Sequence, residues 1–339
     1  MPIAKKNFDT LNQPIDKLYK NKTPWIRNIK VVLSNEKGQS YIFKSGDPEL
    51  NIDIQGTKNL ALNKDKGIVT ITNLPYTFLV KLINEQFYNI EIFAGYGREA
   101  EPERYFKGEV SYISQKIHSN HDVDTYINFA SKYIAKFSQT RMNLTLNSGI
   151  NIYAAVNYIC QAAGINPDYV NVSESLRDSY LPYNIDLYDQ PGNLIEQIVQ
   201  YAGNDFSIST DSSSDSSFYI DCTRLGDKRR IYIDRNSVVI AKGNPTISSA
   251  GLKATLLPMI NLMPGDIIHF PNDMVDASIA SADVTNTRTT EFFDPYGWYM
   301  VRQIDYHFQN RGATFELNIT AIAETKLKES IAEDNEQYK

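Results

Sequence analysis

The sequence predicts an α+β fold that is mainly β, with two strand-rich blocks separated by a short helical region. Three observations lead to this prediction. Apolar and polar residues alternate in short runs from Trp25 to about Phe137. The spacing becomes helical between about residues 138 and 230, and alternation returns from residue 231 onward. A period of two is typical of a strand with one buried face, and a period near 3.6 is typical of a helix.

The first block carries the clearest strand pattern. Leu50, Ile52 and Ile54 alternate with polar residues, which predicts one buried face. Many such short runs, separated by turn residues, indicate a barrel or a sandwich. One short helix is expected over Thr77–Glu85. Four apolar residues are expected to share its inner face: Phe78, Leu79, Leu82 and Ile83.

The middle region contains two helical patterns, each followed by a glycine. The first runs from Ile152 to Ala163, with Gly164 placed to end the helix. The second runs from Leu194 to Ala202 and ends at Gly203. Strand-like pieces precede both helices, so the repetition predicts a small α/β domain. Further along, a Ser- and Asp-rich loop joins two short runs that predict a hairpin, Phe206–Ser209 and Phe218–Cys222.

The last third returns to strands and contains two turn signals. In Met263-Pro264-Gly265-Asp266, proline presets φ and glycine tolerates positive φ, as a type II turn requires. The segment 309–312 predicts the turn of a hairpin, and the strand that follows it, up to residue 322, alternates cleanly.

These patterns divide the chain into five parts. Residues 1–23 are polar and are expected to be a flexible N-terminal arm. Residues 24–137 are expected to form a first strand-rich domain, a barrel or a sandwich, and residues 138–230 an α/β domain with two helices. Residues 231–325 are expected to form a second strand-rich domain, for which exchange of strands with the first is left open. Residues 326–339 are a charged C-terminal tail.

Charge and composition exclude several classes of protein. The net charge of −6 argues against a clamp for nucleic acid, which needs a basic stripe, but not against nucleic acid passing through a hole. Two isolated cysteines predict neither a disulfide framework nor a metal site, and a reducing compartment is expected. No signal peptide and no apolar stretch long enough to span a membrane is expected.

No motif in the sequence predicts catalysis. His118 and His121 have a spacing that some metal sites use, but no further ligand completes the set, so a surface pair is expected. Cys160 lies on the apolar face of a helix and is expected to be an inert thiol. A glycosidase pair of carboxylates stays open, because its spacing exists only in the fold. We therefore assign no catalytic, cofactor-binding or metal-binding residue and expect no enzyme activity and no cofactor.

Short motifs recur in a fixed order along about residues 25–323. Their residues are Asn73 and Leu74, Gly95, Tyr96 and Gly97, Phe106 and Gly108, Gly164, Gly203, Gly251 and Leu257, and Pro264, Gly265 and Asp266. Each motif alone is a strand, turn or helix-end pattern, so the ordered set is more specific than its parts. In this order the segments resemble the hub proteins of phage tail baseplates and of related contractile injection machines, including the N-terminal regions of type VI secretion spikes.

The resemblance implies two tail-tube-like antiparallel β-barrels with smaller α/β peripheral domains. It implies a homotrimer with pseudo-six-fold barrels that joins a six-fold tail tube to a three-fold spike and nucleates the tube. The implied partners are the tail tube protein, a separate central spike protein, the tape-measure protein and baseplate wedge proteins, with DNA only as passing cargo and no membrane insertion. The implied location is the virion tail tip, after assembly in the host cytoplasm. The N-terminal arm and residues 271–296 have no counterpart in the family.

Two alternatives stay open from the sequence. One is a distal tail or receptor-binding adaptor protein, which would lack the paired helix and glycine units. The other is a β-sandwich carbohydrate-active enzyme, for which the 22 tyrosines would suit stacking on sugars. The aromatic residues fall mostly on alternating strand positions, and this favours core packing over sugar binding.

Overall fold

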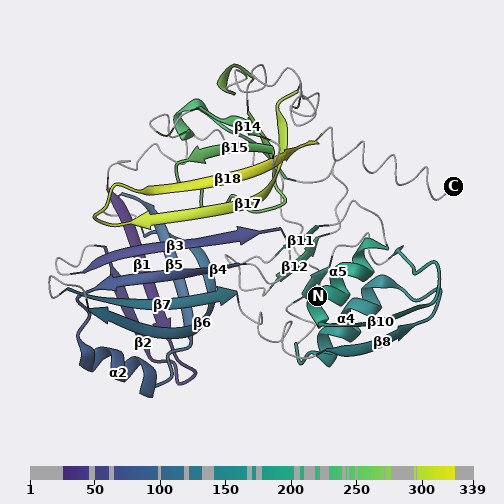
Figure 1. Cartoon of the computed structure of the whole chain (residues 1–339), viewed down its shortest axis with the longest axis horizontal. Helices are drawn as coiled ribbons and strands as arrows, with labels where there is room; N and C mark the ends of the chain where they lie inside the picture. The colour runs from purple at the N-terminus through teal and green to yellow at the C-terminus, as the bar shows by residue number, and fades with distance from the viewer. Residues whose placement is uncertain are drawn as a thin grey trace.

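The computed structural model describes most of the chain between residues 26 and 324. The described residues are 26–45, 50–60, 65–97, 101–117, 122–131, 141–165, 170–172, 178–201, 207–209, 218–221, 229–238, 242, 244–248, 251–270, 272–275, 294 and 296–324. Within them the protein is mainly β and largely antiparallel, as predicted. One sheet of 13 strands dominates, and a two-stranded and a three-stranded sheet lie apart from it (Figure 1).

The large sheet contains strands from both strand-rich blocks. Its order is β14-β15-β18-β17-β3-β4-β7-β6-β5-β1-β2, and β16 pairs with both β17 and β13. The first block supplies β1 (Arg27–Ser34), β2 (Ser40–Lys44), β3 (Asn51–Asn59), β4 (Lys66–Thr72), β5 (Asn89–Tyr96), β6 (Glu103–Ile117) and β7 (Val123–Ser131). The second block supplies β13 (Arg230–Tyr232), β14 (Thr246–Ser248), β15 (Gly251–Leu256), β16 (Ile267–His269), β17 (Trp298–Gln309) and β18 (Phe315–Ala323). Short 3-10 turns, Arg235–Ser237 and Asn272–Met274, interrupt the second block.

The two blocks are joined where β3 pairs with β17. The ladder runs antiparallel from Gln303 opposite Asn59 to Gln309 opposite Asp53. The beginning of β17 pairs with β16 instead, and the change of partner coincides with a bulge between Val301 and Gln303. A bulge bends its strand and changes the strand's direction. The two halves of β17 can therefore pair with two different strands, β16 and β3. Among the described residues no ladder closes either block on itself, so the strands form one open sheet.

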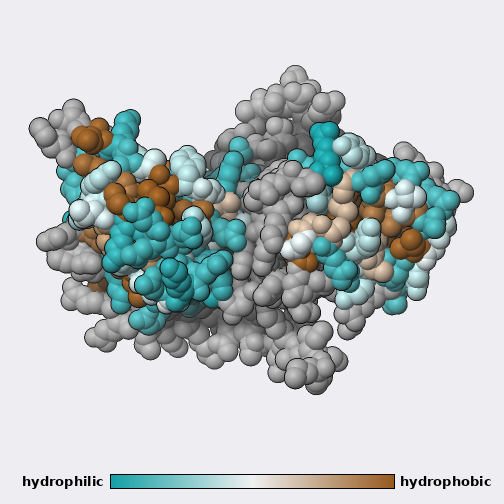
Figure 2. Space-filling model, turned by 90° about the horizontal axis from the view of Figure 1, so that it is seen from below, coloured by the Kyte–Doolittle hydropathy of each residue, from teal (hydrophilic) through white to brown (hydrophobic). Residues whose placement is uncertain are grey.

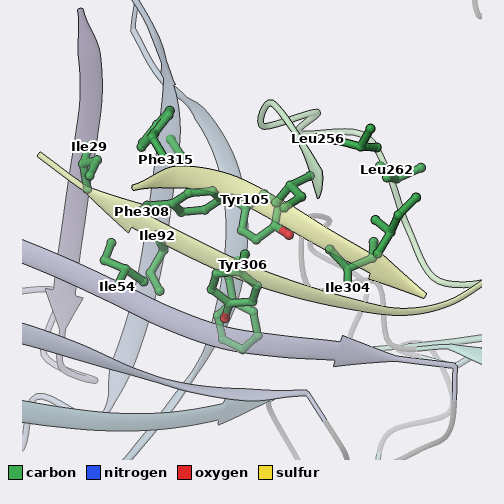
Figure 3. Packing of buried hydrophobic residues seen from close by; sticks show 14 of the residues in the cluster. Ile29, Ile54, Ile92, Tyr105, Leu256, Leu262, Ile304, Tyr306, Phe308 and Phe315 are labelled. Carbon is green, nitrogen blue, oxygen red and sulfur yellow. The ribbon is translucent and has the colours of Figure 1, made fainter. Parts of the chain in front are cut away.

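The sheet folds back on itself around one core that contains residues of both blocks. Strands β1 and β5 lie behind β3 and β17 (Figure 1), and Figure 3 shows Ile29 and Ile92 facing Ile54 and Phe308 across the interior. These four side chains are fully buried. Tyr105 of β6 completes the layer, with its ring centroid 5.0 Å from that of Phe308. Aromatic pairs in such edge-on contact add to the free energy of simple burial.

The helical region has a hydrophobic core of its own. It is built from β8 (Met142–Leu146), α4 (Ile152–Ala162), β10 (Ile185–Asp189) and α5 (Pro191–Gln200). The predicted hairpin is confirmed as β11 (Ser207–Ser209) paired with β12 (Phe218–Asp221), and β9 (Val170–Val172) pairs with β12 in parallel.

Glycine ends α4 as the sequence predicted. Gly164 has a φ of +71° and donates its N–H to the Gln161 carbonyl at 2.9 Å. The N–H of Ile165 reaches the Cys160 carbonyl, also at 2.9 Å. This pair of bonds is a Schellman motif, which satisfies the last carbonyls of the helix. Gly203, expected to end α5 in the same way, lies outside the described residues.

Helix α2 (Tyr76–Asn84) forms close to its predicted position but buries fewer residues than expected. Leu79 and Leu82 are buried, and Phe78 packs against Tyr41 of β2 at a centroid distance of 4.5 Å. Ile83 is 51% exposed, so the prediction that it shares the inner face was wrong. Each residue of a helix is rotated by about 100° from the one before it. The Ile83 side chain therefore points away from that of Leu82 and lies outside the face of α2 that the sheet covers.

Arg27 ties the start of β1 to the hairpin between β17 and β18. Its guanidinium donates to the carbonyls of Gln309, Gly312, Ala313 and Thr314 at 3.2, 2.5, 3.0 and 3.3 Å. A planar guanidinium with several fixed donors suits such convergent acceptors better than an ammonium does. This side chain therefore links β1 to the β17–β18 hairpin, which no ladder among the described residues pairs with β1.

We expect Arg27→Lys to destabilise the protein by about 1–3 kcal/mol, because the ammonium cannot reach all of these carbonyls at once. Thermal melts of the purified variant would measure the loss. Arg302→Lys, at an exposed position on β17, is the matched control and should change stability by no more than about 0.5 kcal/mol. Equal melting midpoints for both variants would contradict the role given to Arg27.

The predicted turn at Met263-Pro264-Gly265-Asp266 is present. The Asp266 N–H donates to the Met263 carbonyl at 3.1 Å, and Gly265 has a φ of +94°. Backbone bonds to Val301 hold the turn against β17. Arg229 binds the Asp266 carboxylate with Nε 2.9 Å from Oδ1, while its Nη2 reaches Oδ2. The turn thus fixes the entry of β16 into the sheet.

We expect Gly265→Val to destabilise the protein by about 1–3 kcal/mol, because a β-branched residue is strained at positive φ. Gly265→Asn should cost less, since asparagine visits positive φ more readily. Thermal melts of both variants test this. An unchanged midpoint for the valine variant would show that the turn does not require glycine.

Candidate functional site

The described residues contain no constellation suited to metal binding. No group of three or more His, Cys, Asp and Glu side chains in this part of the chain is placed to hold an ion. His118, His121 and Cys222 lie outside the described residues. Cys160 is fully buried in the helical core, and burial raises the pKa of its thiol to about 12. The thiol therefore stays protonated at neutral pH and is a poor nucleophile. No described helix has the length and apolar character that a membrane span needs.

One titratable pair lies on the joint between the two blocks, and the sequence did not single it out. His307 Nε2 is 3.0 Å from Asp53 Oδ1. Gln309 donates to Asp53 Oδ2 at 2.6 Å, and Gln55 donates to Asp53 Oδ1 at 3.2 Å. A carboxylate beside an imidazole orients the base in hydrolases, but there the base also contacts a nucleophile. Here the Gln55 amide lies 3.2 Å from His307 Nε2 and the Gln309 amide binds Asp53, so the group links β3 to β17.

The motif residues of the first block lie at strand ends and close approaches. Asn73 has a φ of +62° at the end of β4, and its side chain accepts the N–H of Val123 at 3.1 Å. Leu74, next to it, is buried. Together they set the start of α2 against the start of β7.

The second group of motif residues lies at the ends of β5 and β6. Tyr96 is buried, with its ring centroid 5.1 Å from that of Phe315. Gly95 is opposite Asn28 in the β1 ladder, and Gly97 follows with a φ of +107°. In β6, Phe106 is fully buried, and a Cβ on Gly108 would collide with the Ala130 carbonyl of β7. A glycine there permits close approach of the two strands.

The remaining motif residues also shape the backbone. Gly251 begins β15 with a φ of +104°, and a Cβ there would collide with the Ala321 carbonyl. Leu257 donates its N–H to Ser237 at 2.8 Å, and Pro264, Gly265 and Asp266 form the turn described above. The motif residues are spread over turns, strand ends and a helix end. The described ones among them shape the backbone of a scaffold, and none of them lies on β3 or β17.

Neither a family model nor a curated protein matches the sequence. Solved structures do match the fold. The 43 kDa tail protein of prophage MuSo2 from Shewanella oneidensis has a TM-score of 0.54 at 9% identity, over 88% of this chain and 98% of that chain. The tail protein from Neisseria meningitidis MC58 has a TM-score of 0.54 at 7% identity, over 91% and 99%.

A third match is a component of the type VI secretion system of E. coli, described as structurally similar to two tail proteins of bacteriophage T4. Its TM-score is 0.50 at 12% identity, over 82% of this chain and 74% of that chain. At such low identities the likeness is one of fold, and it extends over most of the chain. The resemblance to tail hub proteins is thus confirmed at the level of the fold: this chain has the architecture of phage tail proteins and of a related type VI secretion component.

Proposed function

We propose that this chain is the structural hub of a phage tail baseplate, or of a related contractile machine. Three copies form an annulus that joins a six-fold tail tube to a three-fold spike and nucleates assembly of the tube. The observation that carries the proposal is the continuous sheet across the β3–β17 joint. This joint holds two strand-rich blocks of one chain in a fixed relation.

The geometry of the blocks supports a match between three-fold and six-fold symmetry. Each chain contributes a first block, β1 to β7, and a second block, β13 to β18. If each block acts as one tail-tube-like barrel in the assembly, three chains present six units to the tube. Ring closure also protects sheet edges such as β2 and β14, each of which has a single partner strand among the described residues.

The proposed partners follow from the same arrangement. They are the tail tube protein on one side, a separate spike protein on the other, and the tape-measure and wedge proteins around them, at the tip of the virion tail. DNA is proposed as passing cargo, since a net charge of −6 per chain does not favour adsorption of a polyanion. No catalysis is proposed, in keeping with the buried thiol and the amide partners of the His307 pair.

An exposed apolar stripe on α2 supports contact between neighbouring copies. Tyr76, Val80 and Ile83 are spaced at i, i+4 and i+7 and are 69%, 37% and 51% exposed. These three residues lie beside the buried face of the helix. The apolar side of α2 is therefore wider than the part of it that packs against the sheet. Figure 2, seen from the side of α2 in Figure 1, shows hydrophobic side chains gathered on that part of the surface. We propose that this stripe packs on the next copy in the ring.

We expect the purified protein to form trimers of 38.5 kDa chains, and Val80→Glu with Ile83→Glu to dissociate them, because burying two carboxylates without partners is costly. Mass photometry measures the oligomer, and thermal melts verify that the variant folds. Thr77→Glu with Asn84→Glu adds the same charge to the polar side of the same helix and should leave the trimer intact. Images of assembled tails with a hub of any other copy number would contradict the proposed function.

A further inference from the structure

The described aromatic side chains of the helical region lie outside its buried core. That core is aliphatic apart from the thiol of Cys160. In the large sheet, by contrast, Tyr105, Tyr299 and Tyr306 are buried. Between residues 141 and 201 the chain has no phenylalanine or tryptophan, and none of its described tyrosines is buried. These tyrosines are Tyr153, Tyr158, Tyr180, Tyr183, Tyr188 and Tyr201.

Two neighbouring loops form one end of the helical region. The loop that joins β8 to α4 lies beside residues 179–184, which lead into β10. The Gly149 N–H donates to the Leu181 carbonyl at 2.9 Å, and the Ser148 N–H donates to Asn184 Oδ1 at 2.7 Å. Such bonds hold both loops in one conformation, so a ligand that binds there does not have to order them first.

Four of the tyrosines gather around these two loops. Tyr180 and Tyr183 belong to the second loop and are 58% and 52% exposed. The ring centroid of Tyr183 is 5.5 Å from that of Tyr201, at the end of α5, in an edge-on contact. Asn151, which caps α4, forms an isolated bridge with Tyr180, and Tyr153 lies in the first turn of α4. These four tyrosines are here called the tyrosine end.

The composition of the loops at the tyrosine end is neutral and polar. Residues 147–153 and 178–184 are mostly Asn, Ser, Gly and Tyr, and Asp178 is their only charged residue. The same residue types dominate the combining sites of antibodies, where tyrosine supplies rigid contact area and Ser and Asn supply adaptable hydrogen bonds. The stripe on α2 has a different character, because Val80 and Ile83 are exposed aliphatic residues.

We infer that the tyrosine end binds a neutral glycan, that is, a chain of uncharged pyranose sugars. A pyranose ring presents C–H groups on its faces and hydroxyl groups around its edge. The C–H faces suit the rings of Tyr180 and Tyr183, and the hydroxyl groups suit the amides and hydroxyls of the two loops. An uncharged ligand also avoids the cost of removing water from a charge that meets no partner.

The inference goes beyond the proposed function and does not depend on the formation of a ring. The helical region has a core of its own and stands beside the large sheet (Figure 1). Neither the β3–β17 joint nor α2 contributes a residue to the tyrosine end.

Binding of the full-length protein to immobilised oligosaccharides tests the inference. The probes are neutral oligomers of glucose, galactose, mannose and N-acetylglucosamine, with heparin as an anionic glycan. We expect binding to at least one neutral oligomer, and Tyr180→Ala and Tyr183→Ala should each weaken it by about tenfold. Tyr188→Ala is the matched control, because Tyr188 is 67% exposed near the other end of β10 and should be replaceable without loss. Thermal melts verify that each variant folds.

Three outcomes would overturn the inference. The first is that no neutral oligomer binds, or that heparin alone does. The second is an equal loss of binding in Tyr188→Ala, which would place the glycan elsewhere. The third is that Tyr183→Ala leaves glycan binding unchanged but releases a protein from assembled tails, which would make this end a protein contact. None of these results bears on the trimer, so the inference and the proposed function fail separately.

Discussion

The pairing of β3 with β17 is the constraint on which the rest of the fold depends. These strands are far apart in the chain, so the loop that they close costs considerable entropy. The ladder is reinforced from both sides of the sheet. On the core side, Tyr306 packs in edge-on contact with Tyr105 at a centroid distance of 4.9 Å. On the other side, Asp53 gathers His307 and two glutamines. Without this joint the two blocks would be separate sheets, and β3 and β17 would each leave an edge unpaired.

A glycine and a buried lysine on β3, Gly56 and Lys58, make room for the aromatic side chains at this joint and bind to one of them. Gly56 of β3 is opposite Gly67 of β4, and a Cβ at Gly56 would collide with the Tyr306 hydroxyl. The absent side chain therefore admits the ring of Tyr306. Close by, fully buried Lys58 donates to the Tyr105 carbonyl at 2.8 Å, and its ammonium lies 3.8 Å from the centroid of the Tyr105 ring. A buried cation is tolerated only with such compensation.

Strand alternation gives one sheet two different surfaces. In β4, Val69 and Ile71 enter the core, and Thr70 and Thr72 face away from it. The same period of two that builds the core therefore also places polar side chains on the opposite side of β4. Helix α2 differs from the strands, because the apolar side chains of Tyr76, Val80 and Ile83 remain exposed beside its buried face. An exposed apolar stripe of this kind is typical of a surface that contacts another protein.

Local features of this protein could be read from the sequence because their causes are local. The turn at Gly265, the Schellman end at Gly164 and the strand around Ile52 each depend on residues a few positions apart. The burial of Ile83 was misjudged, because helical spacing does not reveal how wide a face the sheet covers. The β3–β17 joint, the contact of Asp53 with His307 and the reach of Arg27 could not be predicted, and neither could the union of two blocks in one sheet. Any amphipathic strand fits many partners, and only long-range packing and loop closure select among them. The sequence by itself thus determined which residues form strands and which faces they bury, and the tertiary structure decided which strands meet.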